Sequence, residues 1–136
     1  MGVEPFLVGS SLAATIAQRL VRVLCPKCRQ LYRPIDAELA ELGISRDVVK
    51  PEGFYKPAGC DFCLSTGFFG RTAIYEMLVV DDEVRELIVE HADSVRIKKS
   101  SMSRGMRTLR DDGALKVIHG ITCVSEVLSV TQEDVF

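Results

Sequence analysis

Two pairs of cysteines constrain the fold of this sequence more than any other feature. Each pair has CxxC spacing, the first at Cys25 and Cys28 and the second at Cys60 and Cys63, and 31 residues lie between the pairs. A tight turn at this spacing points both sulfurs to one side, and its backbone amides can donate to them. The four residues, here called the cysteine tetrad, supply a closed tetrahedral shell that suits Zn²⁺ and leaves no position for a reactive water. We therefore predict a structural zinc site.

Other chemistries use the same residue type, and the sequence leaves them open. Two disulfides would need an oxidising compartment, for which no secretory signal is present. A redox-active CxxC motif is disfavoured because two pairs occur and no thioredoxin-like pattern surrounds them. An iron–sulfur cluster could also use four cysteines. The fifth cysteine, Cys123, is predicted to be a small buried hydrophobic residue.

Length and charge narrow the class of protein. The 136 residues suffice for one domain of ordinary size or for two very small ones. A formal net charge of −2 argues against a nucleic-acid module held by bulk electrostatics. The longest uncharged run, from Pro5 to Gln18, has 14 residues, which is short of the roughly 20 apolar residues of a membrane span. We expect a soluble chain in a reducing compartment.

The motifs of common enzyme classes are absent from this sequence. It contains no GxxxxGK(S/T), GxGxxG, HExxH or GxSxG pattern. The two histidines, His91 and His119, are predicted to lie on helix surfaces or helix ends, without a cysteine or carboxylate constellation beside them. A stand-alone enzyme is therefore not expected.

Hydrophobic periodicity predicts an α+β fold, mainly helical, with a small zinc-stapled β element between a leading helix and a C-terminal helical bundle. Apolar residues at helical spacing predict one amphipathic helix over residues 6–24. It should end at Cys25, because the residue before a proline avoids the α region. The other predicted elements are strands at 54–56 and 71–80 and helices at 36–43, after Asp81-Asp82, at 94–103, at 108–119 and at 122–130.

Three arginines are candidates for contacts with a phosphate or with an acidic partner. Arg19 and Arg22 lie three residues apart on the predicted first helix, where a solvated helix face is the simpler interpretation. Arg71 follows a glycine-rich turn and begins the longer predicted strand. It could pair with Glu76, pair with an acid of a partner, or simply end a strand edge.

The order of several segments carries a resemblance to a known family. The segments are Met1–Leu7, Ala17–Cys28, Gly59–Cys63, Thr66–Glu76 and Gly105–Gly113. Together they span nearly the whole chain and resemble the C-terminal portion of the type II secretion and type IV pilus assembly ATPases. Residues 95–103 depart from the pattern, because they are serine-rich where family members tend to be alanine-rich. Serine lowers the helix propensity of that segment.

The resemblance implies a fragment of a motor. Family members are cytoplasmic, ring-forming and generally hexameric ATPases that power pseudopilus or pilus assembly at the bacterial inner membrane. Their Walker A, aspartate-rich, Walker B and histidine boxes lie upstream of the segment that matches Met1. ATP and Mg²⁺ would therefore belong only to the full-length parent, and this chain is not expected to hydrolyse ATP.

By position, the resemblance matches the cysteine tetrad with the zinc site of the family, and Arg19 and Arg22 with arginines near the end of its RecA-like core. It also divides the chain into three parts. Residues 1–24 would end the RecA-like core, residues 25–80 would form a tetracysteine zinc-binding subdomain with short strands, and residues 81–136 would form a C-terminal helical subdomain.

We expect a structural and interaction region that couples the parent ATPase ring to neighbouring subunits or to the inner-membrane platform. Such a region would be peripheral to the membrane through its partners and would not contact nucleic acid. The competing hypothesis is an independent zinc-ribbon-like binding module. The near-neutral charge and the lack of interleaved aromatic and basic residues weigh against it. A catalytic zinc or redox enzyme would need an open coordination position or a reactive thiol.

Overall fold

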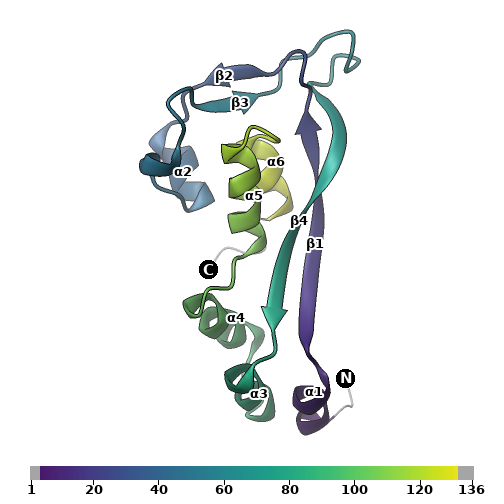
Figure 1. Cartoon of the computed structure of the whole chain (residues 1–136), viewed down its shortest axis with the longest axis vertical. Coiled ribbons are helices and arrows are strands. Elements are labelled where there is room, and N and C mark those ends of the chain that lie inside the picture. Colours follow the sequence, from purple (N-terminus) through teal and green to yellow (C-terminus); the bar gives the residue numbers. More distant parts are fainter. Residues whose placement is uncertain (1–3, 132–136) are drawn as a thin grey trace. The chain divides into compact units, whose positions relative to one another are not determined.

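The computed structural model describes residues 4–131 and confirms the α+β class (Figure 1). In chain order the elements are α1 (Pro5–Ser11), β1 (Ala14–Leu24), β2 (Gln30–Tyr32), α2 (Asp36–Leu42), the 3₁₀-helix η1 (Arg46–Val48), β3 (Phe54–Lys56), β4 (Phe68–Val79), α3 (Asp82–Val89), α4 (Ser94–Ser103), α5 (Leu109–Ile118) and α6 (Val124–Val130). Within this part of the chain, no helix has both the length and the apolar composition that crossing a membrane requires.

The described residues form two compact units. One unit combines the residues up to Ala17 with Tyr75–Thr108, and the other combines Gln18–Ile74 with the residues from Leu109 onward. The strands β1 and β4 pass from one unit into the other. The predicted division into three parts stays a prediction, and its outermost residues, 1–3 and 132–136, lie outside the described residues.

The predicted helix over residues 6–24 is wrong beyond its first turns, because α1 is short and the strand β1 follows it. The prediction depended on the spacing of Leu12, Ile16, Leu20 and Val23, and the first three of these are four residues apart. That spacing is a multiple of two, so it also places side chains on one face of a strand. The β-branched residues of the segment favour a strand, and pairing with β4 satisfies its backbone. The segment still ends at Leu24, where the following Cys-Pro predicts an end.

Both predicted strands form, and each pairs with a partner strand. β1 and β4 run in opposite directions as a two-stranded sheet (Figure 1). Val21 and Ile74 are fully buried on one face of this sheet, whereas Leu20 and Phe69 are about half exposed. This alternation is the two-residue period of a strand. β2 and β3 form the second sheet, which is antiparallel.

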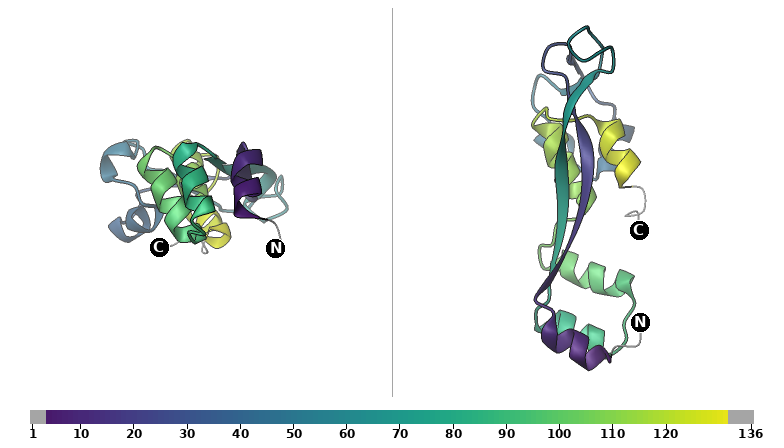
Figure 2. Two further views of the ribbon diagram at one scale, coloured as in Figure 1. Left: turned by 90° about the horizontal axis from the view of Figure 1, so that it is seen from below. Right: turned by 90° about the vertical axis from the view of Figure 1, so that its right-hand side faces the viewer.

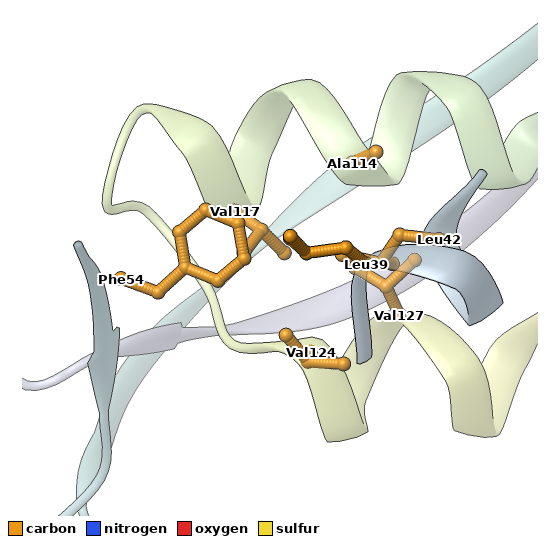
Figure 3. Close-up of a cluster of buried hydrophobic side chains, with 7 residues drawn as sticks. All are labelled: Leu39, Leu42, Phe54, Ala114, Val117, Val124 and Val127. Carbon is orange, nitrogen blue, oxygen red and sulfur yellow. The ribbon is translucent and has the colours of Figure 1, made fainter. Parts of the chain in front are cut away.

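The hydrophobic core of the second unit is shared by α2, β3, α5 and α6 (Figure 3). Its buried side chains are Leu39, Leu42, Phe54, Ala114, Val117, Val124 and Val127. Gly113 on α5 allows α6 to approach closely, because a Cβ at this position would lie 2.5 Å from Cγ1 of Val127. The helices predicted at 36–43, 108–119 and 122–130 therefore form, and their apolar faces meet in this core.

The first unit contains α1, α3 and α4, and α1 packs beside α3 (Figure 2). The guanidinium of Arg85 on α3 donates to the carbonyl of Gly9 on α1 at 3.0 Å. The serine-rich segment does form α4, as predicted. Asp93 caps it by accepting from the amide of Arg96 at 2.8 Å, which offsets part of the low helix propensity.

Asp81 caps α3, as the sequence predicts, and it also links α3 to the end of α4. Its Oδ1 accepts from the Val84 amide at 3.0 Å, and its two oxygens accept from the Arg104 guanidinium at 3.1 Å each. The Val84 amide, and after it Arg104, hold the pKa of Asp81 below its ordinary value. A carboxyl with a lower pKa in the folded state stabilises the fold above its unfolded pKa. That contribution is lost as the pH falls through the folded value.

We expect α3 to lose protection of its amides as the pH falls below about 4, because protonated Asp81 is a weaker cap. Asparagine is also a good N-cap but does not titrate. The variant Asp81→Asn should therefore keep the cap and lack this step. Amide exchange of α3 followed by NMR from neutral pH into the acid range checks this. Identical pH profiles for the two proteins would contradict it.

Candidate metal centre

The two sheets bring the cysteine tetrad to one place. Cys25 and Cys28 lie between β1 and β2, while Cys60 and Cys63 lie between β3 and β4. Because β1 pairs with β4 and β2 pairs with β3, each sheet closes one side of the two turns. The Cys25 amide also donates to the Gly67 carbonyl at 2.9 Å. The long gap between the cysteine pairs contains α2 and η1. It does not separate the sulfurs, because the strands at its two ends, β2 and β3, pair with each other.

The four sulfurs have the spacing of a tetrahedral thiolate site. The Sγ atoms of Cys25 and Cys60 lie 3.8 Å apart, those of Cys28 and Cys63 3.8 Å apart, and those of Cys60 and Cys63 3.7 Å apart. All four lie within 4.8 Å of one another. Sulfurs bonded to a tetrahedral Zn²⁺ at about 2.3 Å would be about 3.8 Å apart. Donor type and spacing therefore fit a zinc ion with four protein ligands.

Backbone amides prepare the site for negative charge. The Gly59 amide donates to Sγ of Cys28 at 3.3 Å, and the amides of Cys60 and Gly67 donate to Sγ of Cys63 at 3.3 and 3.2 Å. Burial raises the pKa of the Cys63 thiol, but these amides and the neighbouring thiols bring the pKa down to about 6. The Gly59 amide lowers the pKa of Cys28, whereas burial and the other thiols raise it to about 11. One cysteine therefore forms a thiolate readily. Four thiolates this close together need a bound cation to balance their charge.

The second turn uses backbone conformations that are uncommon for its residues. Leu64 and Ser65 have φ values of 55° and 64°, and Gly67 has a φ of 81°. A Cβ at Gly67 would lie 2.5 Å from Cβ of Pro57, so only glycine lets this amide reach the sulfur of Cys63. The turn is therefore shaped to present amides to sulfur.

The structure separates Arg19 from the other two candidate arginines. Arg19 and Arg22 lie on β1 rather than on a helix, so their three-residue spacing places them on opposite faces. Arg22 pairs with Glu126 of this chain at 2.7 Å. Arg22 and Arg71 are brought to one hollow of about 590 Å³, which is lined by Leu20, Arg22, Thr66, Phe68, Gly70 and Arg71. Contact of these arginines with a partner or a phosphate stays a prediction.

Other residues singled out in the sequence have structural surroundings. Glu76, a candidate partner of Arg71, pairs with Lys98 at 3.3 Å. Cys123 is 3% exposed, which confirms the prediction of a small buried residue. His91 and His119 are exposed and follow the ends of α3 and α5, as predicted.

Sequence reasoning missed the residues that support the first cysteine pair from the far end of the chain. Glu126 lies 104 residues from Arg22, whose backbone and side chain it binds. The turn between α5 and α6 accepts the amide of Leu24 through the carbonyl of Ile121 at 2.9 Å. No local pattern marks such contacts, because neither partner is unusual in its own segment.

The chain is an α+β protein in which two small sheets bring four cysteine thiols together, where they could hold a metal ion. The chain matches the family described as "Type II/IV secretion system protein" over residues 1–129. It belongs to this family.

Several secretion and pilus-assembly proteins are similar to this chain along nearly its whole length. Type II secretion system protein E of Pseudomonas aeruginosa is 45% identical over 134 residues, which are 98% of this chain and 26% of that protein. Type IV pilus assembly ATPase PilB of Thermus thermophilus is 44% identical over 133 residues, 98% of this chain and 15% of that protein. Type II secretion system ATPase E of Vibrio cholerae is 44% identical over 133 residues, again 98% of this chain and 26% of that protein.

The chain therefore spans about a quarter or less of the length of these relatives. What their names say about secretion, pilus assembly and ATP belongs to those longer proteins.

Proposed function

We propose that the cysteine tetrad binds one structural Zn²⁺. The closed set of four sulfur donors, their spacing of 3.7–3.8 Å and three N–H···S hydrogen bonds support this. When bound, the ion supplies a cross-link between the two turns, and a shell of four thiolates leaves no position for a reactive water. The three-residue strands β2 and β3 are too short to be stable alone, so the ion would contribute much of the stability of this segment.

We further propose that this region serves in a secretion or pilus-assembly motor. The observation that carries the proposal is the similarity of 98% of the chain to proteins named as type II secretion and type IV pilus assembly ATPases. Binding of ATP and Mg²⁺ would belong to the parts of such motors that this chain does not match. In this proposal residues 25–80 carry the zinc staple and residues 81–136 carry the helices that follow it.

The role of the region in such a motor would be structural. It would hold neighbouring subunits of an ATPase ring together or connect the ring to the platform in the bacterial inner membrane, on the cytoplasmic side. The hollow that contains Arg22 and Arg71 would be available for such contacts. This role requires a rigid segment and no reactive site. A metal with four thiolate ligands would hold the two cysteine turns rigidly together and has no open coordination position.

A chimeric motor tests the proposal. The matching segment of type II secretion system protein E from Pseudomonas aeruginosa would be replaced by this chain, and secretion by the host would be measured. We expect the chimera to secrete, the variant Cys60→Ser to secrete at least about tenfold less because the shell loses a thiolate, and the control Cys123→Ala to behave as the parent. Equal secretion by the Cys60→Ser chimera and its parent would sink the proposal.

A further inference from the structure

Both sides of the first cysteine pair are held by the turn between α5 and α6. Before the pair, the Leu24 amide donates to the carbonyl of Ile121 at 2.9 Å, and the hydroxyl of Thr122 donates to the carbonyl of Arg22 at 2.8 Å. After the pair, the guanidinium of Arg29 donates to the carbonyl of Gly120 at 2.8 Å. Three successive residues of one turn therefore bracket the two cysteines.

Glu126 extends this support by one turn of α6. Its Oε2 accepts from the backbone amide of Arg22 at 2.8 Å, its Oε1 accepts from Nε of the same residue at 2.9 Å, and the same Oε1 forms an ion pair with Nη2 at 2.7 Å. The Glu126 side chain is only 12% exposed, so loss of its partner would leave a largely buried charge. The Arg22 guanidinium also lies 4.0 Å from the ring centroid of Phe68, which begins β4 directly after the second turn. Glu126 is thus linked through Arg22 to residues beside both cysteine pairs.

Arg29 makes the matching contact on the other side. Its guanidinium lies 3.9 Å from the ring centroid of Tyr55 on β3 while it donates to Gly120. A Cβ at Gly120 would lie 2.9 Å from the Tyr55 ring and 3.1 Å from Nη1 of Arg29. Gly120 also has a φ of 76°, so both its space and its backbone conformation suit glycine alone. The α5–α6 turn therefore packs closely against Arg29, the residue that follows Cys28.

We propose that Glu126 and Thr122 are positioning residues of the metal centre, so that metal binding and the order of the α5–α6 turn stabilise each other. This inference rests on the proposed zinc site. The physical reason is that groups outside a metal shell fix the ligands in place, and their loss typically weakens the affinity for the metal 10- to 100-fold. By linkage, the free energy that the contacts of Glu126 and Thr122 add to metal binding equals the free energy that the bound metal adds to these contacts.

Zinc affinity of the full chain tests the first half of this inference. Zn²⁺ would be titrated in competition with a chromophoric chelator for the unsubstituted chain, Glu126→Gln and the matched control Glu41→Gln, whose glutamate is exposed on α2. We expect Glu126→Gln to bind zinc about tenfold more weakly and the control to bind it as the parent does. Equal affinities in all three proteins would overturn the inference.

A second pair of variants separates positioning from general loss of stability. Thr122 and Thr131 are both fully buried, and each donates one hydrogen bond from its hydroxyl to a carbonyl. Thr122 lies beside the first cysteine pair, whereas Thr131 follows the other end of α6. Thr122→Val should weaken zinc binding by about tenfold, and Thr131→Val should not. If both variants weaken zinc binding equally, the effect is one of general stability and the inference fails.

Hydrogen exchange of the unsubstituted chain tests the reciprocal half and does not depend on whether a variant folds. Adding Zn²⁺ should slow exchange of the Leu24 amide and of the amides in α6 by about tenfold or more, while α3 in the first unit should be unchanged. Unchanged exchange in α6 would contradict the linkage. If the unsubstituted chain binds no zinc, the proposed function itself fails. If it binds zinc and neither Glu126→Gln nor Thr122→Val matters, only this inference fails.

Discussion

Removing zinc from the chain is expected to melt the segment between β1 and β4 and to lower the melting temperature by at least about 10 °C. Structural Zn²⁺ binds zinc-finger peptides with about 10–16 kcal/mol of apparent free energy, which is comparable to the whole stability of a typical domain. The strands β2 and β3 have three residues each and cannot replace that contribution. Thermal unfolding followed by circular dichroism, with and without a strong chelator, measures the effect.

Two controls make this experiment specific. Adding back Zn²⁺ should restore the transition, whereas Mg²⁺ should not, because it prefers oxygen ligands. The variant Cys123→Ala should respond to the chelator as the parent chain does, because this cysteine lies apart from the tetrad on the N-terminal side of α6. A chelated chain that keeps its melting temperature would rule out a structural role for the metal.

The variant Phe54→Ala is expected to destabilise the second unit by about 3–5 kcal/mol. Phe54 is 1% exposed and packs from β3 against residues of α2, α5 and α6 in the shared core (Figure 3). Truncation to alanine removes most of a buried aromatic side chain, and three converging elements limit how far the cavity can collapse. Chemical denaturation of the zinc-saturated chain gives the free energy of unfolding.

Phe69→Ala is the matched control for this variant. Phe69 is 54% exposed on β4 and stacks on Phe62, with ring centroids 4.6 Å apart. Its truncation should cost no more than about 1.5 kcal/mol, because an exposed aromatic pair contributes little beyond its contact. Similar losses in the two variants would show that Phe54 is not a core residue of the folded chain.

Caps and glycines in the sequence predicted most of the helical structure. Asp81 caps α3, as the sequence predicts, and Gly43, the last residue of the helix predicted at 36–43, ends α2 in a left-handed conformation with a φ of 72°. These signals are local, since a cap and the amide it binds are only a few residues apart. Strand β1 was missed because Leu12, Ile16 and Leu20 have a spacing that suits both a helix and a strand. Only pairing with β4, far along the chain, decides between the two.

The candidate site likewise has a part that the sequence predicts and a part that depends on tertiary packing. The sequence predicts the cysteine tetrad, because two CxxC pairs are a local pattern whose geometry follows from the turn. It does not predict that Glu126 binds Arg22 and that the Gly120 carbonyl accepts from Arg29, although these arginines flank the first cysteine pair and lie 104 and 91 residues away from their partners. Such contacts depend on where α5 and α6 lie, and the position of these helices follows from the core around Phe54 and Val127.

The most direct test of the central claim is the zinc content and zinc X-ray absorption spectrum of the purified full chain. The account predicts one zinc per chain, bound by four sulfurs at about 2.3 Å, with no nitrogen or oxygen ligand. Disulfides, a redox-active CxxC motif or an iron–sulfur cluster would each give a different spectrum or no zinc at all. A chain that purifies without zinc and does not take it up, or one whose zinc is bound by fewer than four sulfurs, would contradict the account.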